Sequence, residues 1–313
     1  MLRLVQTPWG EIAVSDAHVH FFSHRYFSLL AGQAGLSFDD VGARLADWDL
    51  PAVEPESLAA RWVSELDRHG VACAALIASL PGDADSVAAA VRAYRQRFYG
   101  YFMVNPVAPD AARDVAREVE RALDSGALQG VCLFPAMHRY SLHDERVQPI
   151  LEVAAARPGA VVFVHCGVLT VGIRNKLGLA SPFDLRFSNP VDVHALALRY
   201  PKLPFVLPHF GAGYFREALM LCGLCPNVYL DTSSTNSWMK YLGLDLKAVF
   251  ARALEVVGPE RLLFGTDSSF FPRGWHAGVF ERQVTVLREL GVDAEGARQI
   301  LGGNLDRVFG RQV

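Results

Sequence analysis

Residues 12–20 read Ile-Ala-Val-Ser-Asp-Ala-His-Val-His, an apolar run that ends in Asp16, His18 and His20. Alternate residues of a β-strand face the same side, so these three side chains point together. Seven more short apolar runs, β-branched or aromatic, follow along the chain. The eight predicted strands are Ile12–Val14 leading to His20, Val71–Ala78, Tyr99–Val104, Gly130–Phe134, Ala160–His165, Pro204–His209, Asn227–Asp231 and Arg261–Asp267.

Helical patterns alternate with these strands. In the first of them, Leu58, Trp62 and Leu66 recur every four residues before Gly70 ends the pattern. Continuous apolar strands separated by helices are typical of a parallel sheet that is buried on both faces. Eight such units in 313 residues predict an α/β fold, a (β/α)8 TIM barrel forming a single domain over residues 1–313. A doubly wound open sheet is the alternative. The predicted helices are Ser57–His69, Asp83–Arg97, Pro109–Ser125, Asp144–Ala156, Val191–Tyr200, Gly213–Cys222, Leu246–Val257 and Trp275–Leu290.

The composition limits the partners of this chain. With 30 Lys and Arg against 33 Asp and Glu, the net charge is −3, which disfavours binding to nucleic acid. No apolar run approaches the roughly 20 residues that span a bilayer, and the first residues do not form a signal peptide. Five cysteines do not indicate a disulfide framework. We therefore expect a cytoplasmic protein with a small-molecule substrate, whose apolar barrel exterior is compatible with a homodimer.

Metal-binding side chains stand where four of the predicted strands end. His18 and His20 end the first strand, His165 the fifth, His209 the sixth and Asp267 the eighth. In a barrel these ends converge on the face that carries the active site. Imidazoles with a carboxylate suit Zn²⁺ and related ions, and such an ion lowers the pKa of its water to about 7. The pattern thus predicts a metal site that activates water.

Several motifs in this order resemble one family. They are DAHVH (16–20), VHCG (164–167), PHFGAG (208–213), NVYLDTS (227–233), LLFGTDS (262–268) and GNLDRVFG (303–310). The chain resembles the amidohydrolase superfamily, in particular the group that includes aminocarboxymuconate semialdehyde decarboxylase.

The resemblance implies a role for each residue at the strand ends. It implies that His18, His20, His165 and Asp267 hold a divalent ion, Zn²⁺ or alternatively Mn²⁺, and that His209 lies beside the metal-bound water. Many binuclear relatives carry a carboxylated lysine on the fourth strand, where residues 130–135 read Gly-Val-Cys-Leu-Phe-Pro. The missing lysine predicts a single metal ion.

Residues after the strands are candidates for the substrate pocket. Asp16 and Asp231 are expected to support the site by hydrogen bonds, with loop capping as the alternative for Asp231. The long connection Val168–Asn189 is a candidate lid. Arg174, Lys176 and Arg273 lie in such loops and could bind a substrate carboxylate. The predicted substrate-binding residues are Phe21, Phe134, Arg174, Trp238 and Phe271.

Three functions fit this pattern. In the first, the enzyme hydrolyses a lactone, ester or amide: Asp267 takes the proton of the attacking water, and His209 stabilises the oxyanion or shuttles the proton. The second is decarboxylation of an aromatic or unsaturated carboxylic acid. Relatives with that activity use an arginine after the first strand, and Arg44 and Arg61 lie in this region. In the third, the barrel binds its ligand without catalysis.

Overall fold

The computed structural model describes residues 3–108, 114–233 and 237–310. Eight parallel strands form one sheet in the order β3 to β10, and a separate antiparallel hairpin, β1 (Val5–Thr7) and β2 (Gly10–Ile12), precedes them. The eight strands are β3 (Ser15–His20), β4 (Cys73–Ala78), β5 (Phe98–Val104), β6 (Gly130–Leu133), β7 (Val161–Val164), β8 (Phe205–Leu207), β9 (Val228–Asp231) and β10 (Leu262–Leu263).

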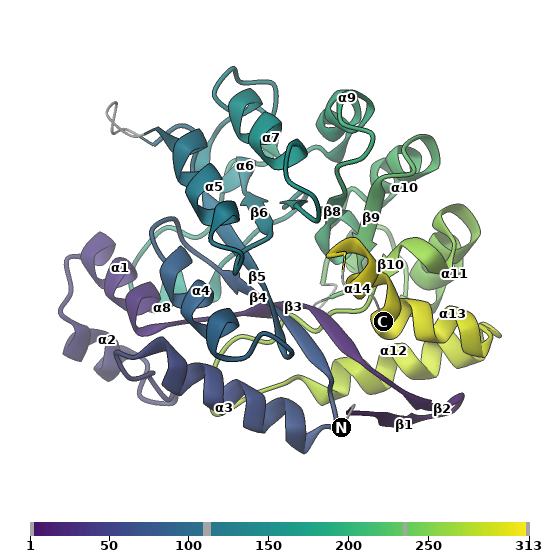
Figure 1. Cartoon of the computed structure of the whole chain (residues 1–313), viewed down its shortest axis with the longest axis horizontal. Helices are drawn as coiled ribbons and strands as arrows, with labels where there is room; N and C mark the ends of the chain where they lie inside the picture. The colour runs from purple at the N-terminus through teal and green to yellow at the C-terminus, as the bar shows by residue number, and fades with distance from the viewer. Residues whose placement is uncertain (1–2, 109–113, 234–236, 311–313) are drawn as a thin grey trace.

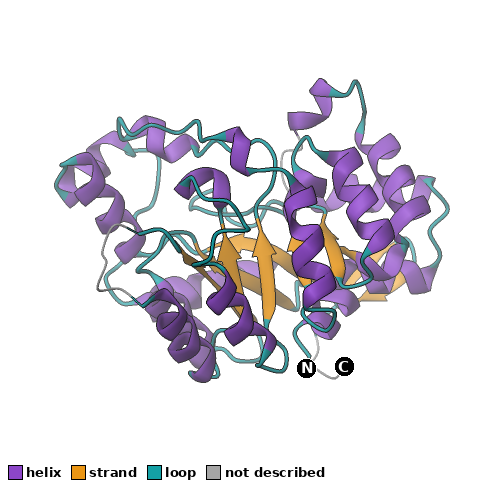
Figure 2. Ribbon diagram, turned by 90° about the horizontal axis from the view of Figure 1, so that it is seen from above, coloured by secondary structure: helices purple, strands orange, loops and turns teal. Residues whose placement is uncertain are grey.

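Helices surround this sheet on its outer side (Figure 2). The α-helices are α1 (His24–Ala34), α2 (Phe38–Arg44), α3 (Pro55–Arg68), α4 (Ala84–Ala93), α5 (Val115–Asp124), α6 (Pro135–His138), α7 (Gln148–Ala155), α8 (Gly172–Lys176), α9 (His194–Arg199), α10 (Phe215–Leu224), α11 (Leu246–Val257), α12 (Ala277–Glu289), α13 (Ala294–Arg298) and α14 (Asn304–Val308). No helix in the described ranges is both long enough and apolar enough to span a membrane.

Hydrogen bonds between β3 and the chain after β10 close the sheet into a barrel. The Ala17 N–H donates to the Phe264 carbonyl at 2.8 Å, and the His20 N–H donates to the Ser268 carbonyl at 2.7 Å. In the other direction, the Asp267 N–H donates to the His18 carbonyl at 3.0 Å. The predicted (β/α)8 barrel is therefore confirmed, and the open doubly wound sheet is excluded.

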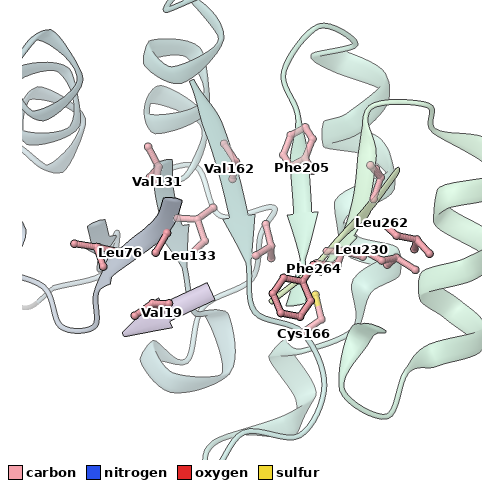
Figure 3. Close-up of a cluster of buried hydrophobic side chains, with 14 of the residues drawn as sticks. Val19, Leu76, Val131, Leu133, Val162, Cys166, Phe205, Leu230, Leu262 and Phe264 are labelled. Atoms are coloured by element: carbon pink, nitrogen blue, oxygen red, sulfur yellow. The ribbon is translucent and has the colours of Figure 1, made fainter. Parts of the chain in front are cut away.

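Three apolar clusters hold the fold together. The largest lies between the strands and the outer helices, and Val19, Val131 and Phe205 in Figure 3 belong to it. The second fills the barrel interior and includes Leu305, Val308 and Phe309, so α14 and the residue after it close the N-terminal end of the barrel. These two clusters bury both faces of the sheet, as the continuous apolar runs predict.

The third cluster lies outside the barrel repeat. It packs α1 and α2 against α8, through buried residues that include Tyr26, Leu30, Ile173 and Leu177. Figure 1 shows α8 beside α1, although about 140 residues separate them in sequence. We call this unit, residues 24–50 with 168–181, the roof.

The predicted elements differ from the observed ones in identifiable places. Ile12 belongs to the hairpin, and the first barrel strand begins at Ser15. The sixth and eighth strands are shorter than predicted and end at Leu207 and Leu263, and the chain then passes through residues with positive φ, namely His209 at 56° and Asp267 at 60°. The predicted helix 109–125 begins at Val115, and its first five residues lie outside the described ranges. The predicted elements include no counterpart of the hairpin or of α1, α2, α6, α8 and α13.

Candidate metal centre

His18, His20 and Asp267 meet at the C-terminal end of the barrel. Each offers one ligand atom, and these atoms lie within 4.8 Å of one another. The two Nε2 atoms are 3.3 Å apart, and Asp267 Oδ1 is 3.1 Å from His20 Nε2 and 3.7 Å from His18 Nε2. Strand β3 therefore presents both imidazoles to the carboxylate that follows β10.

Hydrogen-bond partners fix the tautomer of His18 and His20. His18 Nδ1 lies 2.6 Å from Asp231 Oδ2, and a carboxylate accepts, so Nδ1 carries the proton. His20 Nδ1 lies 2.6 Å from Ser79 Oγ, whose own hydroxyl donates to the Ile77 carbonyl at 3.1 Å. Ser79 thus accepts from His20 Nδ1. Both Nε2 atoms consequently carry a lone pair.

His209 is held in the same way. Its Nδ1 lies 3.1 Å from the Ser233 carbonyl, which can only accept, so the proton is on Nδ1 and the lone pair on Nε2. Ser233 Oγ is also 2.9 Å from His209 Nδ1 and 2.9 Å from His18 Nδ1. Ser233 Oγ therefore contacts both His18 and His209 and links the two imidazole rings.

The arrangement of these donors suits a divalent cation. Two nitrogen lone pairs and a carboxylate oxygen facing one another across less than 4 Å repel unless a positive charge lies between them. Imidazole nitrogens and a carboxylate oxygen are also the ligand types that bind Zn²⁺. Asp231 supplies the carboxylate–histidine contact that commonly orients a metal ligand, as expected for this residue.

His165 lies beside this group without being part of it. Its ring centroid is 5.4 Å from that of His209, and it lines the same cavity, but its nitrogens fall outside the 4.8 Å group. Its buried Nδ1 has no hydrogen-bond partner among the described residues. Of the four predicted ligands, three meet and the fourth stands next to them.

The pKa shifts of His20, His165, His209 and Asp267 favour metal ligation, whereas that of His18 opposes it. Burial lowers the pKa of His20, His165 and His209, which keeps these imidazoles neutral. Burial also lowers the pKa of His18, but the opposing attraction of the nearby carboxylates outweighs it, and that pKa is raised. Burial alone would raise the pKa of Asp267, yet its contact with His20 and the other neighbouring imidazoles hold it below its usual range.

The backbone at the site is strained and supported from below. His209 and Asp267 both have left-handed φ values, which are unusual for residues other than glycine. Asp16 lies beneath them, fully buried, and accepts hydrogen bonds from the Thr266 N–H at 3.0 Å and from Trp275 Nε1 at 2.8 Å. Burial raises the pKa of Asp16 to about 6. As expected, Asp16 supports the site and does not face the cavity.

A cavity of about 550 Å³ lies above the donor group. Three of the predicted substrate-binding residues, Phe134, Arg174 and Trp238, line it. Phe21 and Phe271 do not, and their neighbours Phe22 and Phe270 take those places. Tyr26, Trp48, Lys176 and Arg273 also line the cavity.

The two misplaced aromatic residues pack on the outer side of the barrel. Phe21 is fully buried in the cluster beneath the outer helices. The Phe271 ring packs 4.8 Å from that of Trp62 on α3, and the Arg61 guanidinium lies 3.9 Å from its centroid. The prediction for Phe21 and Phe271 is therefore corrected by one residue in each case.

A family model described as Amidohydrolase matches residues 15–311 of this chain. The chain belongs to the amidohydrolase family. This confirms the resemblance drawn from the motifs, and a divalent metal is general in this superfamily.

Among curated proteins, this amidohydrolase is similar to protein fluG of Emericella nidulans. The two are 31% identical over 163 residues, which cover 50% of this chain and 18% of fluG. The chain matches less than a fifth of the length of that relative.

Three solved structures share the fold of this amidohydrolase. An uncharacterised TIM-barrel protein, Bb4693 from Bordetella bronchiseptica, has a TM-score of 0.64 at 20% identity and covers 95% of this chain and 99% of its own. A putative 2-pyrone-4,6-dicarboxylic acid hydrolase from Pseudomonas putida has 0.57 at 19% identity, with coverage of 96% and 99%. A Burkholderia multivorans amidohydrolase with bound zinc has 0.58 at 17% identity, with coverage of 96% and 99%.

Some residues of this amidohydrolase site were missed from the sequence. Ser79 and Ser233 each follow a strand end, which is the same signal that identified the histidines. Trp48 lies between α2 and α3, outside the strand–helix repeat, so no sequence pattern identifies it as a cavity residue. Arg44 and Arg61, the arginines considered for decarboxylation, do not line the cavity among the described residues.

Proposed function

We propose that this chain is a mononuclear metal-dependent hydrolase of a small lactone, ester or amide. The observation that carries the proposal is the meeting of His18 Nε2, His20 Nε2 and Asp267 Oδ1 at the floor of a 550 Å³ cavity. We assign these three residues and His165 as the ligands of one divalent ion, Zn²⁺ or Mn²⁺. The unpartnered, buried Nδ1 of His165 supports its inclusion, because buried polar atoms normally have partners.

When bound, a divalent ion supplies Lewis-acid chemistry, polarising a carbonyl and making water nucleophilic at neutral pH. Residues of the protein carry out the proton transfers. Asp267 is ionised, so its carboxylate can take a proton from the attacking water and return it to the leaving group. His209 keeps its proton on Nδ1 against Ser233, so its Nε2 is free to accept a proton or to hold a protonated oxygen.

Several observations support hydrolysis by a single ion. Strand β6 contributes Phe134 to the cavity at the position after its end, and Cys132 is fully buried inside the barrel. The described residues contain one group of metal-type ligands and no second group beside it. Arg44 and Arg61, the arginines considered for decarboxylation, do not line the cavity among the described residues, which supports hydrolysis over decarboxylation. The shared fold with a protein described as a pyrone dicarboxylic acid hydrolase is consistent with lactone hydrolysis.

The zinc-loaded protein should release protons from lactones or esters, or free amine from amides, and no carbon dioxide from aromatic carboxylates. Metal analysis should return one ion per chain. His209→Ala should retain the ion and lose turnover, whereas His18→Ala should lose the ion. Carbon dioxide release without hydrolysis would establish the decarboxylase instead, and silence in both assays with metal bound would favour a binding barrel.

A further inference from the structure

Ser233 lies between His18, assigned above as a metal ligand, and His209. It follows β9, it is fully buried, and it does not line the cavity. Its Oγ is 2.9 Å from Nδ1 of both imidazoles, and a hydroxyl oxygen has two lone pairs with which to accept both protons. His18 belongs to β3 and His209 follows β8, and these two strands are not neighbours in the sheet. One buried hydroxyl therefore links two rings that come from unpaired strands.

The two imidazoles depend on Ser233 to different degrees. His18 Nδ1 also lies 2.6 Å from Asp231 Oδ2, so that ring would keep a charged partner without the serine. Among residues 3–108, 114–233 and 237–310, the ring of His209 has its hydrogen bonds with Ser233 alone, to Oγ at 2.9 Å and to the backbone carbonyl at 3.1 Å. Loss of the Ser233 hydroxyl should therefore affect His209 more than His18.

The surroundings of Ser233 keep its hydroxyl in place. The Ser233 N–H donates to Asp231 Oδ1 at 2.6 Å, so one carboxylate holds this backbone and, through Oδ2, the His18 ring. The backbone of Gly265 packs against the same group, and a Cβ added there would lie 2.8 Å from Ser233 Cβ and 3.1 Å from His18 Cβ. Glycine thus allows a close approach that a larger residue would prevent, and the tight packing restricts movement of the serine.

The orientation of the His209 ring decides which of its atoms faces the metal centre. The ring centroid is 5.0 Å from that of His18 and 5.4 Å from that of His165, so the ring stands beside two assigned ligands. A half-turn about the Cβ–Cγ bond would exchange Nε2 with Cε1 and Nδ1 with Cδ2. The turned ring would place a carbon, in place of a donor, against both oxygens of Ser233. These two acceptors therefore favour the orientation in which Nε2 is available to substrate.

We propose that Ser233 is a positioning residue, whose hydroxyl holds the His209 ring in the orientation that directs Nε2 towards the cavity. The inference rests on the proposed function, in which His209 Nε2 accepts a proton or holds a protonated oxygen. Because Ser233 does not line the cavity, it acts through His209 and not by contact with substrate. Because Asp231 holds His18 independently, Ser233 mainly serves turnover and Asp231 mainly serves metal binding.

The ring orientation is tested by NMR of zinc-loaded protein that is labelled at the histidine ring nitrogens. Ser233→Ala removes the hydroxyl, and Thr232→Val is the matched control, since Thr232 is equally buried but its Oγ1 donates to Gln283 Oε1 at 2.7 Å. His209→Ala assigns the signals of that ring. Wild type and Thr232→Val should show one set of His209 signals, in the Nδ1–H form. In Ser233→Ala these signals should split or broaden as the second orientation becomes populated, while those of His18 persist.

Kinetics and zinc affinity separate positioning from a structural role. With dihydrocoumarin as the lactone, Ser233→Ala should lower kcat about 3- to 10-fold, the effect of one neutral hydrogen bond, and leave KM unchanged. Its zinc affinity, measured by competition with a chromogenic chelator, should stay within about 3-fold of wild type, whereas Asp231→Asn should lose more. Ser233→Cys, whose thiol is a weak acceptor, should have a kcat between those of wild type and Ser233→Ala.

Unchanged His209 signals in Ser233→Ala would overturn the inference, as would a loss of zinc affinity as large as that of Asp231→Asn. Melting temperature checks that each variant is folded, and Ser233→Cys carries the same comparison if Ser233→Ala does not fold. If wild type hydrolyses no lactone, ester or amide while the His209 signals still depend on Ser233, the proposed hydrolase function is wrong and the positioning of His209 stands.

Discussion

The two ends of the barrel differ in the kind of side chain that they contain. At the C-terminal end, His209 and Asp267 hold left-handed backbone conformations, and polar side chains face a cavity. At the N-terminal end, Leu305, Val308 and Phe309 fill the interior with apolar contacts. One end thus keeps strained and partly desolvated polar groups in place, and the other supplies packing that holds them there.

This contrast predicts that residues at one end of the barrel determine function and residues at the other end determine stability. Substitutions at the C-terminal end should change chemistry with little loss of folding free energy, because the side chains there gain little from burial. Substitutions at the N-terminal end should do the opposite. The predictions below test this division.

The largest effect is expected for Asp267→Asn. An amide cannot take the proton of the attacking water and is a poorer metal ligand, so turnover should fall at least about 10³-fold. Melting temperature should stay within a few degrees of wild type. Steady-state kinetics and calorimetry measure the two quantities, with Asp124→Asn, an exposed carboxylate paired with Arg157, as the control. A large loss of stability without loss of turnover would contradict the assignment of function to the C-terminal end of the barrel and of stability to the N-terminal end.

Phe309→Ala tests the opposite end. The Phe309 ring is 3% exposed and packs 4.5 Å from Tyr99 and 5.2 Å from Tyr101. Removing it should lower the free energy of unfolding by about 3–5 kcal/mol. Turnover per folded molecule should be retained. Denaturant unfolding measures the loss, and Leu224→Ala, at a side chain 65% exposed, should have little effect.

Asp231→Asn should have an intermediate effect on metal binding. The carboxylate accepts the His18 Nδ1 proton at 2.6 Å and so orients the imidazole, and an amide can present its NH₂ group instead. Loss of such a partner typically weakens metal affinity about 10- to 100-fold. Competition with a chromogenic zinc chelator gives the affinity. An affinity equal to that of wild type would show that Ser233 alone holds His18.

The smallest effect concerns stability against pH. Burial raises the pKa of Asp83 from 3.8 to about 6, although Ser23 Oγ donates to its carboxylate at 2.8 Å. The folded pKa exceeds the unfolded one, so the stability contributed by protonated Asp83 is present below pH 4 and is lost as pH rises through 6. The shift corresponds to at most about 3 kcal/mol.

Asp83→Asn stays neutral throughout this range. It should therefore gain about 1–2 kcal/mol relative to wild type between pH 4 and pH 7. Urea unfolding at both pH values measures the difference. Parallel stability curves for the two proteins would show that Asp83 is not the group responsible.

The barrel and much of the site could be predicted from sequence because both depend on simple patterns. Apolar β-branched runs mark strands buried on both faces, and histidines at their ends stand out against that background. Phe21 and Phe271 were misplaced by one residue because alternation no longer holds once a strand has ended. Trp48 belongs to the roof, which follows no repeat.

The strained turns also escape prediction. No glycine marks the left-handed conformations at His209 and Asp267, and nothing in the sequence indicates that β8 and β10 are short. The contact between α1 and α8 is equally hidden. It joins segments about 140 residues apart through ordinary apolar side chains, such as Leu30 and Ile173.

The hydrogen bonds of Asp16 have a consequence for synthesis on the ribosome. They join the first barrel strand to Thr266 and Trp275, which are 250 and 259 residues further along. A nascent chain lacking its last fifth therefore exposes β3 and β9 as unpaired sheet edges, open to intermolecular pairing. His18 and Asp267 can come together only after this late contact between the first strand and the chain beyond β10 has formed.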